Sequence, residues 1–309
     1  MSRHALVTGA AGFIGSNLCR NLLAEGWKVT GVDDLSSGHL ELVNGLKGLK
    51  MVLNDFASEF ILDAVMNNDF DVVFHVAAVP RVSYSVENPA DTTLNNVAKT
   101  VKLMEACRGK VDRFVFSSSS SVYGGAEVMP TPVDQPRDPK SPYAWQKSSI
   151  EDLLRMFGDL YDFDSVCLRY FNVFGPNQYG DSPYSTAISA WCHAVKEGLP
   201  LRKDGSGDQS RDMCYVDNVV DVNIRAASHE GTFRGEAFNV ACGDRTSNNQ
   251  ILEKFQEKFG KLNINQAPFR QGDVMHTQAD ISETERVFGY KPLVRFWEGL
   301  DKTFEWRDI

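Results

Sequence analysis

The chain has 309 residues, of which 42% are hydrophobic and 24% charged, so it can bury a sizeable core in one large domain or two unequal lobes. Its formal net charge of -9, without any Lys/Arg-rich run, argues against binding to nucleic acid or to an anionic membrane. The sequence has no signal-peptide pattern, no apolar stretch long enough for a bilayer, and six scattered cysteines. These features predict a cytoplasmic protein with free thiols and no metal site.

Short apolar runs alternate with amphipathic stretches along the first half of the chain. The runs that predict strands are Ala5–Thr8, Lys28–Val32, Lys50–Leu53, Val72–Val76, Phe114–Ser117 and Val166–Tyr170. The stretches that predict helices between them are Ile14–Glu25, Thr92–Arg108 and Tyr143–Leu160. This alternation predicts an α/β fold with a doubly wound parallel sheet of the Rossmann type over residues 1–172.

After residue 172 the alternation gives way to irregular connections rich in Gly, Pro and Asp. Shorter helices are predicted there, for example over Val216–Ser228 and Ser247–Lys258. We interpret residues 173–309 as mainly a smaller substrate-binding lobe over the carboxyl edge of the sheet, where ligands of such folds bind. Elements of this part can also return to the sheet.

The first predicted strand leads into a glycine-rich turn that opens a helix, Thr8-Gly9-Ala10-Ala11-Gly12-Phe13-Ile14-Gly15. Gly9 permits the tight turn, Gly12 lets the backbone approach a pyrophosphate, and Gly15 allows close packing of helix on strand. The helix start at Phe13 and Ile14 presents free N–H groups to phosphate charge. The spacing G-x-x-G-x-x-G is typical of short-chain dehydrogenases and predicts a dinucleotide site.

The second predicted strand runs into Asp33 and Asp34 about twenty residues later, where an acid binds the adenosine ribose hydroxyls. A helix N-cap at either residue is the alternative. An acid here repels a 2′-phosphate, and the following Ser36, Ser37 and Gly38 include no Arg, so NAD is favoured over NADP. The residues expected to border the adenine and the nicotinamide ribose follow the third and fourth strands: Asp55, Phe56, Val76, Ala77 and Ala78.

Tyr143 and Lys147 lie one helical turn apart on one face of a predicted helix. A tyrosine titrating near pH 10 is a poor base at neutral pH, and a neighbouring ammonium together with the positive nicotinamide ring is expected to lower its pKa. A serine run, Ser117–Ser121, follows a strongly apolar strand. Its hydroxyls are therefore expected in the ligand crevice at the carboxyl end of the sheet.

These motifs, with Ser141-Pro142-Tyr143 and Arg169-Tyr170-Phe171-Asn172, recur in this order in extended short-chain dehydrogenases. The chain resembles the UDP-hexose 4-epimerases of that family over nearly its whole length. The resemblance implies that NAD-dependent epimerisation passes through a transient 4-keto sugar, with Tyr143 as base and Lys147 beside it. It implies that Ser119 bridges the 4-hydroxyl and Tyr143. It also implies that Asn96 anchors the loop near the nicotinamide and that Ser117 and Tyr170 contact the cofactor on the nicotinamide side. Asn172 is the implied ligand of the substrate's phosphates.

A sugar nucleotide carries two phosphates, which arginines bind well. By resemblance, Arg211 and Arg270 are the phosphate ligands, Asp273 binds the uridine ribose, and Thr277 occupies the gate beside C2 of the hexose. A small residue at the gate leaves room for an N-acetyl group. Ser120 and Ser121 add hydroxyls for an amide or a carboxylate.

The resemblance is therefore to the UDP-N-acetylglucosamine 4-epimerase subgroup, with UDP-glucose and UDP-glucuronate 4-epimerases as alternatives. Dehydratase and decarboxylase chemistry needs acids where Ser120 and Ser121 stand. A non-catalytic NAD sensor is the distant alternative, because a sensor need not keep the Ser, Tyr and Lys set. The family also implies a homodimer through the helices Thr92–Arg108 and Tyr143–Leu160. The two helices have more apolar positions than packing of one face against a sheet requires. These positions are Val97, Val101, Met104, Ile150, Leu153, Leu154 and Phe157.

Overall fold

The computed structural model describes residues 2–80, 82–125, 127–181, 185–269 and 274–309. Its main sheet holds seven parallel strands in the order β11-β6-β5-β4-β1-β2-β3. The strands are β1 (His4–Thr8), β2 (Lys28–Asp33), β3 (Leu49–Leu53), β4 (Val72–His75), β5 (Arg113–Ser119), β6 (Ser165–Tyr170) and β11 (Arg234–Val240). The predicted doubly wound sheet is confirmed, and the six predicted strands agree to within two residues at each end.

The strand order reverses direction at β1, which lies between β4 and β2. Connections leave this point toward both edges of the sheet, so the loops after β1 and β4 diverge and leave a crevice above the carboxyl ends. The glycine-rich turn and the segment that follows β4 both lie at this switch point. The topology therefore places the predicted dinucleotide site where such folds bind ligands.

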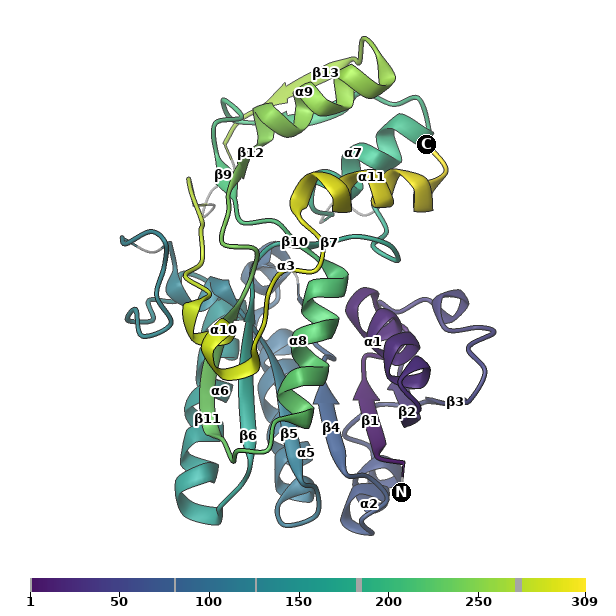
Figure 1. Ribbon diagram of the computed structural model, residues 1–309, viewed down its shortest axis with the longest axis vertical. Coiled ribbons are helices and arrows are strands. Elements are labelled where there is room, and N and C mark those ends of the chain that lie inside the picture. Colours follow the sequence, from purple (N-terminus) through teal and green to yellow (C-terminus); the bar gives the residue numbers. More distant parts are fainter. Residues whose placement is uncertain (1, 81, 126, 182–184, 270–273) are drawn as a thin grey trace.

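Helices cover both faces of the sheet (Figure 1). One face packs against α1 (Phe13–Ala24) and α8 (Val216–Ser228), and the other against α2 (Glu59–Met66), α5 (Lys99–Cys107) and α6 (Pro142–Tyr161). In α6, the Ser141 hydroxyl accepts a hydrogen bond from the Ala144 N–H and Pro142 occupies the first turn, which are strong helix-start features. This cap fixes where the helix that carries Tyr143 and Lys147 begins.

The predicted helix over Thr92–Arg108 is helical over nearly its whole length, but it is not one regular α-helix. The chain forms two short helices, α3 (Val82–Glu87) and α4 (Pro89–Thr93), then one π-helical segment, η2 (Leu94–Ala98), before α5. The wider turn contains Asn96, whose side chain is hydrogen-bonded to the main chain of Val79. A π turn of this kind is frequent at functional sites and is invisible to apolar periodicity.

Two elements of residues 173–309 return to the sheet. Strand β11 pairs with β6 at the edge, and α8 packs across the same sheet. The sequence predicted the helix over the same residues, Val216–Ser228, but did not predict the strand. The polypeptide therefore crosses between the sheet and the smaller lobe more than once.

The smaller lobe lies above the carboxyl ends of the strands (Figure 1). Its helices are α7 (Ala187–Lys196), α9 (Asn248–Phe259) and α11 (Phe296–Arg307), while α10 (Ser282–Phe288) lies beside β11. Its strand pairs are short: β7 (Val173–Phe174) with β10 (Cys214–Tyr215), β8 (Leu201–Asp204) with β13 (Ile264–Ala267), and β9 (Ser210–Arg211) with β12 (Thr246–Ser247). Short pairs leave much of the lobe's geometry to side-chain contacts.

The six cysteines are buried and unpaired, as predicted. Over the described ranges, no His, Cys, Asp or Glu cluster could hold a metal ion. Within the same ranges, none of the helices combines the length and apolar character that crossing a membrane requires.

Candidate active site

Two positions of the glycine-rich turn, Gly9 and Gly15, have no room for a side chain. Gly9 has a φ of +68°, and a Cβ on it would lie 2.9 Å from the Ala77 backbone. A Cβ on Gly15 would lie 2.0 Å from the Gly9 carbonyl oxygen. At Gly12, which is the N-cap of α1, the Gly9 oxygen is the single described neighbour within 4 Å of such a Cβ. The turn thus leaves Phe13 and Ile14 to open a helix whose first N–H groups face an uncrowded space.

The two acids after β2 have different environments. Asp33 is buried and accepts hydrogen bonds from the N–H groups of Ala11 (3.0 Å) and Leu35 (2.8 Å), and burial raises its pKa. A Cβ on Gly38 would lie 2.6 Å from the Asp33 carboxylate, so glycine is required there. Asp34 is exposed and accepts from the Ser36 N–H (2.9 Å). Neither acid caps a helix. Asp34, Ser36 and Ser37 are exposed, so their side chains are accessible to a ribose.

The segment after β4 is held from two sides. The Thr8 hydroxyl accepts hydrogen bonds from the N–H groups of Val76 and Ala77, both at 3.1 Å. Asn96 binds the Val79 main chain through both its amide oxygen (2.8 Å) and its amide nitrogen (3.2 Å). Ala78 lies between these two fixed points, so Asn96 anchors the segment that the sequence assigned to the nicotinamide ribose.

The predicted adenine wall is tied to neighbouring elements. Asp55 pairs with Lys99 at 2.6 Å, and the Phe56 ring lies 4.9 Å from the ring of His75. The buried His75 was missed by the sequence analysis. It is hydrogen-bonded to the hydroxyls of Thr8 and Thr100, both at 2.8 Å, and burial lowers its pKa to about 3. This neutral histidine connects the strand that leads into the glycine turn with the helix that follows Asn96.

Ser119, Tyr143 and Lys147 come together at the carboxyl end of β5. Ser119 lies close enough to Tyr143 to lower the pKa of its phenol, and the Lys147 ammonium lies 5.8 Å from the centre of the Tyr143 ring. Lys147 donates to the Ser117 carbonyl at 2.7 Å and also lies over the Phe116 ring. The serine–phenol contact predicted for an acid–base pair is therefore present, with the cation beside it.

The electrostatics of this group differ from the expectation that Lys147 lowers the pKa of Tyr143. Burial raises the pKa of Tyr143 to about 12, and the neighbouring Ser119 hydroxyl is the group that lowers it. Burial likewise lowers the pKa of Lys147 to about 7, against the attraction of Glu151. The lysine turns toward the Ser117 carbonyl rather than the phenol oxygen. In the protein alone, desolvation outweighs the neighbouring cation.

The serine run divides its side chains among several partners. The Ser117 hydroxyl and the Tyr170 hydroxyl lie 3.0 Å apart, and Asn223 of α8 donates to the same Tyr170 oxygen at 2.8 Å. Tyr170 is thus buried with its hydroxyl directed into the sheet. Ser119 accepts from the Ser121 N–H, which begins the turn η3 (Ser120–Tyr123). The Ser121 hydroxyl is buried without a hydrogen-bond partner among the described residues.

Two buried side chains of α6 were also missed. Glu151 pairs with Arg169 of β6 at 2.7 Å, four residues beyond Lys147 on the same helix face. Gln146 is fully buried: it accepts from Asn96 (2.8 Å) and donates to Thr92 (2.9 Å) and Thr93 (3.0 Å). The i, i+4, i+8 spacing from Tyr143 could have indicated Glu151. No motif indicates Gln146.

The lobe brings three of the predicted substrate residues together. Asn172 donates to the Thr277 hydroxyl at 3.2 Å and to the Asp212 carbonyl at 3.4 Å. Arg211, next to Asp212, donates to the Met275 carbonyl at 3.1 Å. Arg270 and Asp273, the other predicted ligands, lie outside the described residues.

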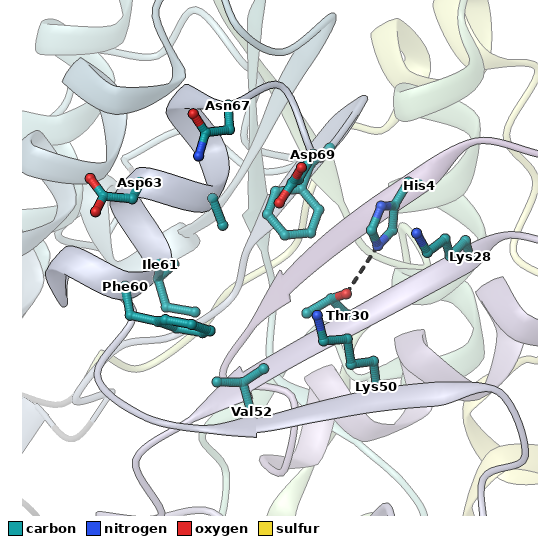
Figure 2. A pocket seen from close by; sticks show the side chains of 12 residues that line it. His4, Lys28, Thr30, Lys50, Val52, Phe60, Ile61, Asp63, Asn67 and Asp69 are labelled. Carbon is teal, nitrogen blue, oxygen red and sulfur yellow. Dashed lines mark hydrogen bonds between the residues drawn. The ribbon is translucent and has the colours of Figure 1, made fainter.

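A cavity of about 370 Å³ lies elsewhere, at the edge formed by β1, β2, β3 and α2 (Figure 2). His4, Lys28, Lys50, Phe60 and Asp69 are among its lining residues, and His4 is hydrogen-bonded to Thr30 there. None of its lining residues is a predicted site residue. It opens beside the amino ends of β1 and β2, away from the carboxyl edge that carries Tyr143.

Comparison with known proteins shows the family of the chain. The model of the NAD dependent epimerase/dehydratase family matches residues 5–241. The chain is 37% identical to a UDP-glucose 4-epimerase of Mycolicibacterium smegmatis, over 97% of both chains. Among solved structures, it is similar to UDP-N-acetylglucosamine 4-epimerase from Methanobrevibacter ruminantium in complex with UDP-N-acetylmuramic acid (TM-score 0.93, 35% identity, 99% and 98% of the chains). It is also similar to UDP-glucuronic acid 4-epimerase from Bacillus cereus with UDP-glucuronic acid and NAD (TM-score 0.90, 30% identity, 99% of both chains). The chain belongs to the NAD dependent epimerase/dehydratase family and is an enzyme whose cofactor is NAD.

Proposed function

We propose that this NAD-dependent enzyme is a UDP-sugar 4-epimerase that interconverts UDP-N-acetylglucosamine and UDP-N-acetylgalactosamine, and that also accepts UDP-glucose and UDP-galactose. The observation that carries the epimerase assignment is the grouping of Ser119, Tyr143 and Lys147 at the carboxyl end of the sheet. The similar proteins named above are 4-epimerases of three different UDP-sugars. The sugar is therefore assigned from the residues of this chain.

The glycine turn, Asp34 and the Asn96-held segment form the surface that would hold the cofactor. The chemistry supplied by bound NAD is the reversible two-electron oxidation of sugar carbon 4, which gives a 4-keto sugar. Tyr143 removes the proton of the 4-hydroxyl as the hydride leaves carbon 4. After the 4-keto sugar turns over, the hydride would be returned to the opposite face of carbon 4, and Tyr143 gives the proton back to the 4-oxygen. Ser119 links that hydroxyl to Tyr143, and Lys147 stabilises the phenolate.

The preference for N-acetylated sugars rests on Thr277 and the serine turn. Thr277 is a small side chain at the position assigned to the gate beside C2, so the acetamido group has room. Ser121 carries a buried hydroxyl without a described partner, and such a group is stabilised when a ligand supplies one. An amide and a carboxylate can both do this, so UDP-glucuronate is the second candidate.

The test is an NMR time course in which UDP-N-acetylglucosamine, UDP-glucose and UDP-glucuronate are offered in parallel to the same enzyme. We expect the 4-epimer of UDP-N-acetylglucosamine to form fastest, and solvent deuterium not to enter carbon 4. If UDP-glucuronate turned over fastest, the serine turn would instead be assigned the role of binding the sugar's carboxylate. Deuterium at carbon 4 would overturn the oxidation–reduction route, and no turnover of any of the three would leave NAD sensing as the function.

A pair of variants tests Thr277 as the gate. Thr277→Tyr fills the space beside C2 but also removes the hydroxyl that accepts from Asn172 and from the Asp212 N–H. Thr277→Val removes the same hydroxyl without adding volume. Overpacking costs typically 1–3 kcal/mol, so only the tyrosine variant should lower the ratio of N-acetylated to plain hexose turnover, by roughly five- to a hundredfold. An unchanged ratio in Thr277→Tyr would place the gate elsewhere.

We also propose that two copies pair through η2, α5 and α6. Met104, Ile150 and Leu154, from which the sequence suggested this, are fully buried in the chain's own core and cannot line such an interface. The candidates are instead Trp145 and Met156, both about half exposed. They lie eleven residues apart, which is three turns of α6, so they share one stripe.

Leu94 of η2 is a further exposed apolar side chain, at 56%. Light scattering of the wild type should give the mass of a dimer at micromolar concentration. Leu94→Glu with Met156→Glu should give a monomer, while Leu293→Glu, a change at an equally exposed leucine of the C-terminal part, should not. A monomeric wild type would refute the pairing.

A further inference from the structure

Asp212 is a fully buried acid that no motif assigned to a role. It follows Arg211 in the connection between β9 and β10. One carboxylate oxygen accepts a hydrogen bond from the Cys242 N–H at 2.9 Å. The other accepts from the N–H groups of Gly243 at 3.0 Å and Ala279 at 3.1 Å. Hydrogen bonds from main-chain N–H groups to an ionised carboxylate are among the stronger ones in proteins.

These three donors belong to two segments that are distant in sequence. Cys242 and Gly243 follow β11, so they extend from the carboxyl end of the central sheet. Ala279 lies two residues after Thr277, and its neighbour in space is Thr131, with which it forms a β-bridge. The Asp212 carboxylate therefore joins a fixed point on the sheet to the segment that carries the proposed gate.

The main chain of Asp212 completes the arrangement. Its N–H donates to the Thr277 hydroxyl at 3.3 Å, and its carbonyl accepts from the Asn172 amide at 3.4 Å. Asn172 in turn donates to Thr277 at 3.2 Å. Three of the residues assigned to the sugar nucleotide are thus attached to this one residue: Asn172, Thr277 and Arg211.

We infer that Asp212 is a positioning residue for substrate, which sets the relative placement of Arg211, Asn172 and Thr277 without touching the substrate itself. The inference rests on the proposed function, because it concerns where the sugar nucleotide binds. Asp212 has no exposed surface, so it acts through the segments that it joins. Replacement by asparagine keeps the shape but turns an NH₂ group toward at least one of the main-chain N–H donors, where neither group can accept.

The experiment compares Asp212→Asn with the wild type as NAD-bound enzymes. UDP affinity is measured by calorimetry, and KM and kcat with UDP-N-acetylglucosamine. Misplacement of binding groups costs up to about a hundredfold. We therefore expect the Kd of UDP and the KM to rise together about ten- to a hundredfold, with kcat changed less than about threefold. A merely structural role predicts the reverse pattern: unchanged KM and UDP affinity, with kcat lowered by the inactive fraction. That pattern, or wild-type values throughout, would overturn the inference.

The matched control is Asp280→Asn. This carboxylate lies on the same segment, but its described contact is with the exposed Ser282 N–H, so KM and UDP affinity should not change. If Asp212→Asn does not fold, Thr277→Val carries the test, because it removes the Thr277 links to Asp212 and Asn172 without disturbing a buried charge. Thr277→Val should also raise the Kd of UDP, but by a smaller factor than is expected for Asp212→Asn. An unaltered Kd would refute the inference. A wild type that neither binds UDP nor turns over a UDP-sugar would instead refute the proposed function.

Discussion

The sheet and the smaller lobe hold their functional residues in different ways. In the sheet, Ser119, Tyr143 and Lys147 lie on a seven-residue strand and a twenty-residue helix, and their side chains meet because those elements pack. In the lobe, the strands next to the candidate ligands have two residues each. Asn172 and Thr277 meet across 105 residues of sequence through single hydrogen bonds.

This difference has a functional consequence. A site built on long regular elements is insensitive to the loss of one contact, whereas a site built from loops joined at one residue is not. We therefore expect changes in the sheet to affect the chemistry equally for every sugar, and changes in the lobe to affect affinity and sugar choice. The four predictions below sharpen or break this division.

The largest effect is expected for Tyr143→Phe. The change deletes the oxygen that is proposed to remove the proton and leaves the ring in place, so kcat should fall by about 10² to 10⁴. If the division holds, the factor is the same for UDP-N-acetylglucosamine and UDP-glucose, and the Kd of UDP stays at its wild-type value. Tyr161→Phe at the exposed end of the same helix removes the same atom and should leave kcat unchanged. Different factors for the two sugars would break the division.

The second-largest effect is a loss of folding stability, which we expect for Arg169→Met. Arg169 and Glu151 are almost fully buried between β6 and α6, and removal of one partner leaves the other charge desolvated. Breaking such a pair costs about 3–5 kcal/mol, which denaturant unfolding can measure. Arg286→Met breaks the exposed pair with Glu283 and should cost no more than about 1 kcal/mol. Equal losses in the two variants would show that Arg169 does not stabilise the sheet in this way.

The sequence predicted most of the sheet because its signals are local. The glycine turn and six strands follow from apolar runs and spacings within a few residues, and the N-terminus of α6 follows from Ser141-Pro142. Strand β11 was not predicted because Gly235 and Glu236 interrupt its apolar pattern, and its pairing with β6 shifts register at that point. An edge strand needs fewer apolar residues than a central one.

The parts of the site that could not be predicted are contacts between residues far apart in sequence. The π turn at η2 is fixed by Asn96 reaching Val79, and helical periodicity contains no signal for it. Asp212 meets Cys242 across 30 residues and Ala279 across 67, so no spacing rule links them. The raised pKa of Tyr143 in the protein alone could not be predicted for the same reason, because burial depends on the whole fold.

The third prediction uses the two buried groups whose pKa lies at about 7, one in each region. Burial lowers the pKa of Lys147 from 10.5, so between pH 7 and 10.5 the unfolded chain binds more protons and stability rises with pH. Burial raises the pKa of Asp212 from 3.8, so between pH 3.8 and 7 the folded chain binds more protons and stability falls as pH rises. Each slope is at most about 1.4 kcal/mol per pH unit.

Unfolding free energies measured over both windows test these signs. Lys147→Met should lose the alkaline rise and keep the acidic fall, and Asp212→Asn should do the opposite. If both variants lost the same slope, or if the wild type showed neither, the buried charges would not titrate independently in the two regions.

The smallest effect is expected for Gln146→Met. Gln146 lies between Tyr143 and Lys147 on α6, and its side chain is fully buried. Its amide joins α6 to Thr92, Thr93 and Asn96. Methionine keeps the volume and leaves one Asn96 N–H unpaired, which loosens the hold of Asn96 on Val79. Because that segment is proposed to border the cofactor, NAD should bind about five- to tenfold more weakly, roughly 1 to 1.4 kcal/mol, as measured by titration of cofactor-free enzyme.

The value of this variant lies in its contrast with Asp212→Asn. Gln146 and Asp212 are both buried polar residues that join distant segments, but one joins elements on the cofactor side and the other joins those of the lobe. Gln146→Met should therefore weaken NAD and leave the Kd of UDP unchanged, while Asp212→Asn does the reverse. The same substitution at the exposed Gln256 of α9 controls for the loss of an amide and should change neither. If Gln146→Met weakened UDP as much as NAD, the two regions would be one coupled unit, and the choice of sugar could not be altered in the lobe without changing the cofactor site.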